Sequence, residues 1–145
     1  LPASRTEVAS ASSEGVSAPL AHRGARILVV DDEPRIGHLI ERSLGNSHHV
    51  VCVTDPRVAL QAVRAGARYD VVLCDLMMPQ MTGIDLYYEI VQVAPEQAER
   101  VVFMTGGAFT PLAQEFLESV PRPRVDKPFD FRALRAMVRD MMDAA

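Results

Sequence analysis

Short apolar blocks recur along the chain, and each is bounded by polar or turn-forming residues. The blocks are residues 27–30, 50–53, 71–74, 101–104 and, more weakly, 123–126. Uninterrupted runs of β-branched and other apolar residues are typical of strands that are buried on both faces. The pattern therefore predicts five strands of one parallel sheet.

Stretches of helical length lie between these blocks and carry their own start and stop signals. Asp55 and Thr110 each stand directly before a proline, which combines an N-cap residue with a proline at the first helical position. Pro95 is expected to end another helix, and Asp130 is expected to cap the last one. The five predicted helices are 34–45, 56–66, 83–94, 111–119 and the segment after Asp130.

Strands that alternate with helices in this way predict an α/β fold, a doubly wound five-stranded parallel sheet with five helices. In such sheets the ligand crevice lies beyond the carboxyl ends of the strands. Residues 1–25 are rich in Ala and Ser and have no apolar period, which predicts a flexible linker ahead of one domain at 26–145. Functional residues are therefore expected where strands end.

Composition narrows the classes of function. The chain has 145 residues, of which 48% are hydrophobic and 23% charged, as in a single soluble domain. With a net charge of −4 and no long apolar run, neither nucleic-acid binding nor membrane contact is expected. Cys52 and Cys74 fall in predicted strands and are expected in the core. The chain opens without a secretory signal, which indicates a cytoplasmic protein, and without an initiator Met, which suggests a piece of a longer one.

The residues that follow the predicted strands form an unusual set. Asp31 and Asp32 follow the first strand and Asp75 the third. Thr105 follows the fourth strand and Lys127 the fifth. Because the carboxyl ends of parallel strands meet at one edge of a sheet, these side chains are expected to converge. Crowded carboxylates are costly unless a cation neutralises them, and hard oxygen ligands suit Mg²⁺, so the sequence predicts a magnesium site.

A phosphoryl group is the expected companion of this metal. Magnesium held by carboxylates usually completes its coordination with phosphate oxygens, and Thr105 and Lys127 offer a hydrogen bond and a positive charge to the same group. A carboxylate can itself attack phosphorus and form an acyl phosphate. Asp75 is the best candidate for this nucleophile, since Asp31 and Asp32 can hold the metal from another strand end.

Four segments resemble successive motifs of response-regulator receiver domains in bacterial two-component signalling. They are ILVVDDEP from residue 27, DLMMPQMTGIDL from residue 75, VVFMTGG from residue 101 and DKPFD from residue 126. The resemblance covers residues 26–143 and implies the flavodoxin-like receiver fold. It also implies a phosphorelay function in which a histidine kinase or histidine phosphotransfer domain donates the phosphoryl group from a phosphohistidine. Catalysis would then be limited to the domain's own phosphorylation and dephosphorylation.

The resemblance assigns the phosphoryl contacts residue by residue. Asp75 matches the phosphoacceptor, and Thr105 and Lys127 match the pair that contacts the phosphoryl group. The family's Lys-Pro bond is typically cis, so the bond between Lys127 and Pro128 is expected to be cis as well. This geometry would aim the lysine into the site.

The same resemblance assigns the metal ligands. Asp32 matches a direct Mg²⁺ ligand, and Asp31 matches an acid that acts largely through water. Asp75 is shared between metal and phosphoryl group. Met77 matches the position whose backbone carbonyl binds the metal, a role that any side chain permits.

One position departs from the family pattern. In receivers, phosphorylation recruits the Thr and shifts an aromatic residue that stands three positions before the Lys; here that position is Arg124. Phe109 or Phe129 could substitute for the missing aromatic residue, but packing in the core is the more usual role of such a side chain and is expected for both. The face made by helix 111–119, strand 123–126 and the last helix is the candidate surface for a homodimer.

Softer similarities concern the parent protein. The loop after Thr105 and the Pro-rich approach to Lys127 resemble receivers at the C-terminus of hybrid histidine kinases. The opening LPAS resembles the last strand of a kinase ATP-binding domain. With the linker and the chain end at Ala145, these features favour a terminal receiver of a hybrid sensor histidine kinase over a free-standing regulator.

Three alternatives stay open beside this interpretation. Asp31 or Asp32 could cap the following helix without any ligand, but capping accounts for one acid and not for two together with Asp75. A Mg²⁺-dependent phosphohydrolase of the haloacid-dehalogenase type would carry a DxD pattern after its first strand. Here the first strand is followed by Asp31, Asp32 and Glu33, which do not form that pattern. A receiver fold that binds a partner without phosphorylation is kept in view by Arg124.

Overall fold

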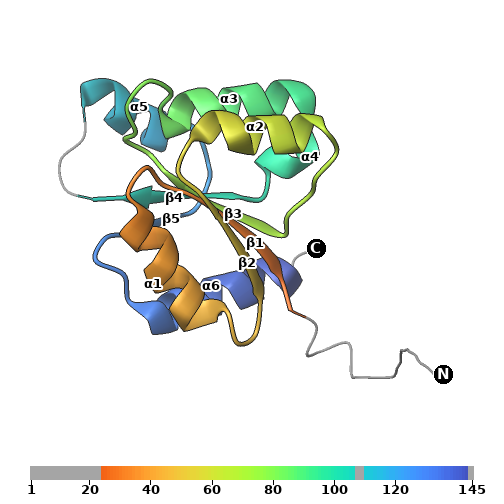
Figure 1. Ribbon diagram of the computed structural model, residues 1–145. Coiled ribbons are helices and arrows are strands. Elements are labelled where there is room, and N and C mark those ends of the chain that lie inside the picture. Colours follow the sequence, from red (N-terminus) through yellow and green to blue (C-terminus); the bar gives the residue numbers. More distant parts are fainter. Residues whose placement is uncertain (1–23, 107–109, 144–145) are drawn as a thin grey trace.

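A five-stranded parallel sheet lies at the centre of the molecule, and helices cover both of its faces (Figure 1). A computed structural model describes residues 24–106 and 110–143. Their elements are, in chain order, β1 (Arg26–Val30), α1 (Pro34–Leu44), β2 (His49–Val53), α2 (Pro56–Arg64), β3 (Val71–Asp75), α3 (Gly83–Val93), α4 (Pro95–Ala98), β4 (Val101–Thr105), α5 (Pro111–Ser119), β5 (Arg124–Asp126) and α6 (Phe131–Asp143). The predicted doubly wound α/β fold is confirmed. No helix among the described residues is long and apolar enough to cross a membrane.

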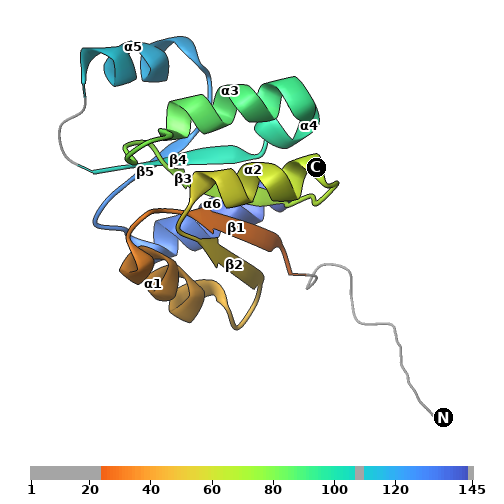
Figure 2. The ribbon, with the colours of Figure 1, turned by 45° about the horizontal axis from the view of Figure 1, so that its top comes forward.

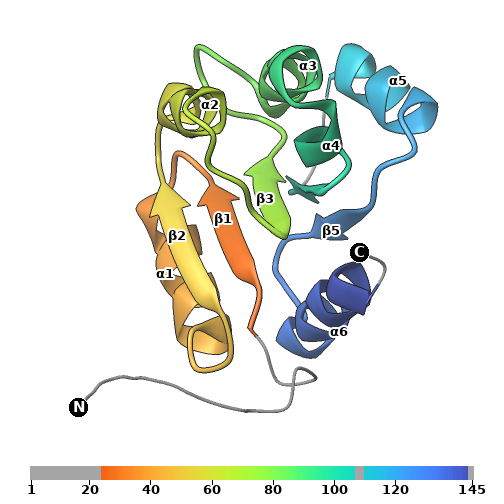
Figure 3. The same ribbon diagram turned by 90° about the vertical axis from the view of Figure 1, so that its right-hand side faces the viewer.

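The strand order β2-β1-β3-β4-β5 places the first strand between the second and the third. The direction of winding therefore reverses between β1 and β3, and this switch point is where ligands bind in open α/β sheets. Figure 3 shows β1 and β3 side by side, and their register pairs Val30 with Cys74 near the carboxyl ends of the two strands. Asp31 and Asp75 consequently emerge next to each other.

Alternating strand residues form two separate cores, one on each face of the sheet. Ile27 and Val29 pack with the α1 residue Ile40 and the α6 residue Leu134. Leu28 and Val30 belong to the opposite core, which α2, α3 and α5 cover (Figure 2). Each fully buried aliphatic side chain contributes about 1.5–3 kcal/mol. The sheet that carries the functional residues is thus fixed from both sides.

Most helix starts follow the predicted signals. The Asp55 side chain accepts a hydrogen bond from the Arg57 amide, and the Thr110 hydroxyl accepts one from the Ala113 amide. Asp130 accepts amide hydrogen bonds at the start of α6. Local sequence therefore determines where these helices begin.

The number of helices differs from the prediction of five. The helix before Pro95 ends as expected, but Pro95 then opens α4, a separate helix of four residues. Ala94, with φ −156° and ψ 76°, interrupts the helical path between the two. Proline cannot continue a helix yet fits the first position of a new one, so the same residue both ends and starts a helix. The described residues thus form six helices.

The edge strands β2 and β5 are less buried than the pattern predicted. Cys74 in the central β3 is buried as expected, but Cys52 in β2 is exposed, so its assignment to the core was wrong. A strand at the edge of a sheet has a neighbour on one side only, and its apolar residues need not be covered. Phe129 is partly buried against the α1–α6 core, whereas Phe109 lies outside the described residues, as does the predicted linker up to residue 23.

Gly83 begins α3 directly against the end of β3. A Cβ atom at this position would overlap the backbone carbonyl oxygen of Asp75 and lie 3.0 Å from the Cα atom of Leu76. The start of α3 is fixed by a capping box, in which the Thr82 hydroxyl and the Asp85 carboxylate each accept the other residue's amide. Only glycine allows the helix to begin this close to the site.

We expect Gly83→Ala to lower the free energy of unfolding by about 1–3 kcal/mol, because the new methyl group must displace backbone beside Asp75. Urea denaturation followed by circular dichroism measures the change. Gly106→Ala is the matched control, since the atoms nearest to its Cβ would be side-chain carbons of Lys127, at 3.4 Å and beyond. Its stability should stay within about 0.5 kcal/mol of wild type. Wild-type stability of Gly83→Ala would contradict the close approach.

Candidate functional site

Three acidic side chains meet beyond the ends of β1 and β3. Asp31 and Asp32 directly follow β1, and Asp75 is the last residue of β3. One carboxylate oxygen of each residue lies within 4.8 Å of the others. The convergence that the sequence predicted for these acids is present, because adjacent parallel strands end at the same edge.

Asp31 is buried and has both carboxylate oxygens engaged. Its Oδ1 accepts the backbone amide of Glu33 at 2.9 Å, and its Oδ2 accepts Lys127 Nζ at 2.7 Å. Asp32 is exposed. The N-cap residue of α1 is Glu33, and no side chain caps it. Neither aspartate is therefore a capping residue, which removes the alternative explanation for this pair.

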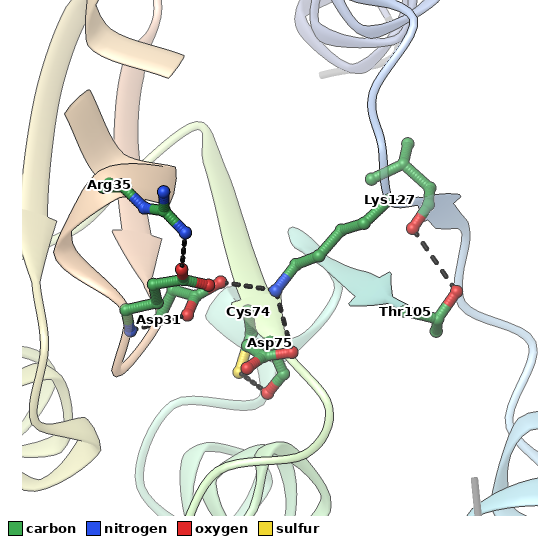
Figure 4. A network of polar contacts seen from close by, with 8 residues as sticks. Asp31, Arg35, Cys74, Asp75, Thr105 and Lys127 are labelled. Carbon is green, nitrogen blue, oxygen red and sulfur yellow. Dashed lines mark hydrogen bonds and ion pairs between the residues drawn. The ribbon is translucent and has the colours of Figure 1, made fainter. Parts of the chain in front are cut away.

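Lys127 approaches the acids from the edge of the sheet that is formed by β5. It follows β5, and its Nζ lies 2.7 Å from Asp31 Oδ2 and 3.4 Å from Asp75 Oδ1 (Figure 4). The bond to Pro128 is cis, as predicted. Burial alone would lower the pKa of Lys127, but the two carboxylates outweigh this effect and raise it. The lysine is therefore a firmly charged ammonium between two acids.

The surroundings of Asp75 disfavour the ionised form of its side chain. Burial is the largest cause that raises its pKa, followed by the charge of Asp31; Lys127 lowers it but does not compensate, and the pKa rises to about 6. When all three carboxylates are ionised, the one ammonium leaves two negative charges unbalanced. Oxygen donors with excess negative charge fit a hard divalent cation such as Mg²⁺.

Thr105 lies at the same edge, but its hydroxyl is bonded elsewhere. The side chain is buried, and Oγ1 donates to Asp126 Oδ1 at 2.6 Å. In Figure 4 the hydroxyl is directed toward β5, away from the Asp75 carboxylate. Thr105 lies at the strand end where the sequence predicted it, whereas its partner Asp126, the first residue of the DKPFD segment, was not among the predicted site residues. The strand register would have been needed to find it.

Met77 and Arg124 are both exposed. Met77 lies two residues beyond Asp75, and its side chain is exposed. Arg124, at the position where receivers carry an aromatic residue, is exposed at the start of β5. No described contact takes Arg124 into the acidic cluster.

Comparisons with known proteins agree with this arrangement. The family described as response regulator receiver domain matches residues 27–139. The DNA-binding response regulator MtrA of Mycolicibacterium smegmatis is 36% identical over 79% of this chain and 49% of its own length. The transcriptional regulatory protein ZraR of Escherichia coli is 34% identical over 81% of this chain and 26% of its own length. The chain thus spans about half or less of these relatives.

Solved structures give the same result. The receiver domain of a sensor histidine kinase from Pseudomonas aeruginosa, with magnesium ion coordinated in the active site cleft, is 25% identical with a TM-score of 0.71 and covers 83% of this chain and 98% of its own. NtrX from Brucella abortus is 27% identical with the same TM-score of 0.71, over 83% of this chain and 27% of its own. From its fold, its acidic cluster and these similarities, the chain belongs to the response regulator receiver domains, the phosphoacceptor modules of two-component signalling.

Proposed function

We propose that Asp75 is the residue that accepts the phosphoryl group. Asp31, Asp32, Asp75 and the backbone carbonyl of Met77 would hold Mg²⁺, and Thr105 and Lys127 would contact the phosphoryl oxygens. The observation that carries this assignment is the position of Lys127 Nζ between the carboxylates of Asp31 and Asp75, at 2.7 and 3.4 Å. An ammonium placed there can neutralise a group bound to Asp75 without being a metal ligand.

The proposed transfer uses groups that the site supplies. An ionised Asp75 oxygen attacks the phosphorus, a P–O bond forms, and the bond between phosphorus and the donor nitrogen breaks. Bound magnesium would offset the negative charge that the three carboxylates and the phosphoryl oxygens bring together. Lys127 keeps its proton throughout, because two carboxylates raise its pKa.

The partner that fits this chemistry is a phosphohistidine, on a histidine kinase or on a histidine phosphotransfer domain. We place the reaction in the cytoplasm. The similar receiver domain of a sensor histidine kinase supports a hybrid kinase as the parent protein, whereas the curated relatives are DNA-binding or transcriptional regulators. The genomic sequence upstream of Leu1 separates these origins, since a histidine-kinase core is expected only for the first.

Phosphorylation at Asp75 is tested with acetyl phosphate and Mg²⁺, followed by intact mass measurement. We expect wild type to gain the mass of one phosphoryl group and Asp75→Asn to gain none, because the amide is not a nucleophile toward phosphorus. Asp140→Asn, on the exposed surface of α6, is the control and should gain the group as wild type does. A mass gain in Asp75→Asn, or none in wild type, would refute the assignment.

Removal of the Asp75 charge should stabilise the metal-free protein. In the unfolded chain this carboxyl titrates near 4, and in the folded protein near 6. The folded state therefore holds its proton more tightly, and stability is lost as the pH rises from about 4 to about 6. With EDTA at pH 7, we expect the free energy of unfolding of Asp75→Asn to exceed that of wild type by on the order of 1–3 kcal/mol.

Thermal unfolding with and without Mg²⁺ supplies the complementary measurement. Added Mg²⁺ should raise the Tm of wild type, because it binds the folded site alone, and should raise that of Asp75→Asn much less. The Asp140→Asn control should behave as wild type in both conditions. If Asp75→Asn were less stable than wild type in EDTA, the ionised Asp75 carboxylate of wild type would not be destabilising.

A further inference from the structure

Asp126 holds the hydroxyl group that the phosphoryl group would need. Thr105 Oγ1 donates to Asp126 Oδ1 at 2.6 Å, the length of a hydrogen bond to an ionised carboxylate. A second acceptor, the Val125 carbonyl oxygen, is 3.5 Å away and contributes little. Thr105 is 3% exposed, so no solvent molecule competes freely for its proton.

The sheet itself builds this contact. Thr105 and Asp126 are register partners in the parallel pair of β4 and β5, which places their side chains on the same face. The next residue along the chain, Lys127, donates its backbone amide to the Thr105 carbonyl oxygen at 2.7 Å. Thr105 and Lys127 are thus both attached to the end of β5, and the Thr105–Asp126 hydrogen bond is set by the strand register.

A threonine hydroxyl has a single proton to donate. While this proton is given to Asp126, it cannot be given to a phosphoryl oxygen, which is an acceptor only. We propose that Asp126 is a positioning residue that holds the Thr105 hydroxyl away from the phosphoryl site, so that phosphorylation of Asp75 exchanges one anionic acceptor for another. This inference rests on the function proposed above for Asp75 and Thr105.

The exchange has a consequence at the surface. Asp126 is exposed and lines a groove of about 340 Å³ between β5 and α6, together with Arg124, Phe129 and Met137. Once Thr105 turns to the phosphoryl group, the Asp126 carboxylate is free at this edge. Phosphorylation would then leave an unpaired negative charge on β5. The same strand carries Arg124 at the position of the switching aromatic residue.

Beryllofluoride, a phosphoryl mimic, tests the proposal in the presence of Mg²⁺ by calorimetric titration. We expect Asp126→Ala to bind it about tenfold more tightly than wild type, because the Thr105 hydroxyl no longer has to leave an anionic acceptor. Asp126→Asn should give a smaller gain, since its amide oxygen still accepts the hydrogen bond without the charge. Equal gains in the two variants would overturn the proposal, because charge removal alone would then explain them.

A double-mutant cycle separates the hydrogen bond from general electrostatics. In a Thr105→Ala background, Asp126→Ala should leave the beryllofluoride affinity unchanged, because no hydroxyl remains to be released. The same tightening with and without the hydroxyl would overturn the proposal, as would no effect of Asp126→Ala in the wild-type background.

The circular dichroism spectrum and Tm of each variant verify folding, and a purely structural role would change Tm without this pattern of affinities. If wild type takes up neither beryllofluoride nor a phosphoryl group at Asp75, the proposed function itself fails. Normal uptake by wild type with no dependence on Asp126 overturns the positioning role alone.

Discussion

The structure of this receiver domain depends on one electrostatic constraint, the crowding of three carboxylates at the switch point of the sheet. Two of these acids, Asp31 and Asp75, are nearly buried, and among the described residues Lys127 is the cation that pairs with them. A lysine cannot balance three negative charges, so the cluster suits a hard cation, and the proposed phosphoryl group would bind through that cation and Lys127. The chemistry follows from an imbalance that the rest of the fold maintains.

The fold can maintain it because the sheet is fixed from both faces. Two independent apolar cores hold β1 and β3 in register, and the ends of these strands carry the acids with no loop between. Gly83 brings the start of α3 against the Asp75 carbonyl, which further restricts the space around the acid. Burial then raises the cost of the Asp75 charge, so stability is opposed to the proposed reactivity at the same residue.

Much of this arrangement could be predicted from the sequence, because each part has a local signal. Apolar runs predicted the central strands, and capping residues such as Asp55 and Thr110 predicted helix starts. Features that depend on tertiary position could not be predicted in this way. Cys52 lies in an apolar run yet is exposed, because β2 turned out to be an edge strand. The partner of Thr105 depends on the β4–β5 register, for which the sequence carries no local pattern.

The short strand β5 connects the site to the surface more directly than any helix does. Its three residues end with Asp126, which bonds Thr105, and the next residue is Lys127, which bonds Asp31 and Asp75. A phosphoryl group on Asp75 would attract the ammonium and the hydroxyl together, and both are attached to this one segment. An edge strand has a sheet neighbour on one side only, so it has more freedom to shift than β3 or β4. Displacement of β5 can therefore transmit the state of Asp75 with an arginine, and no aromatic ring, at position 124.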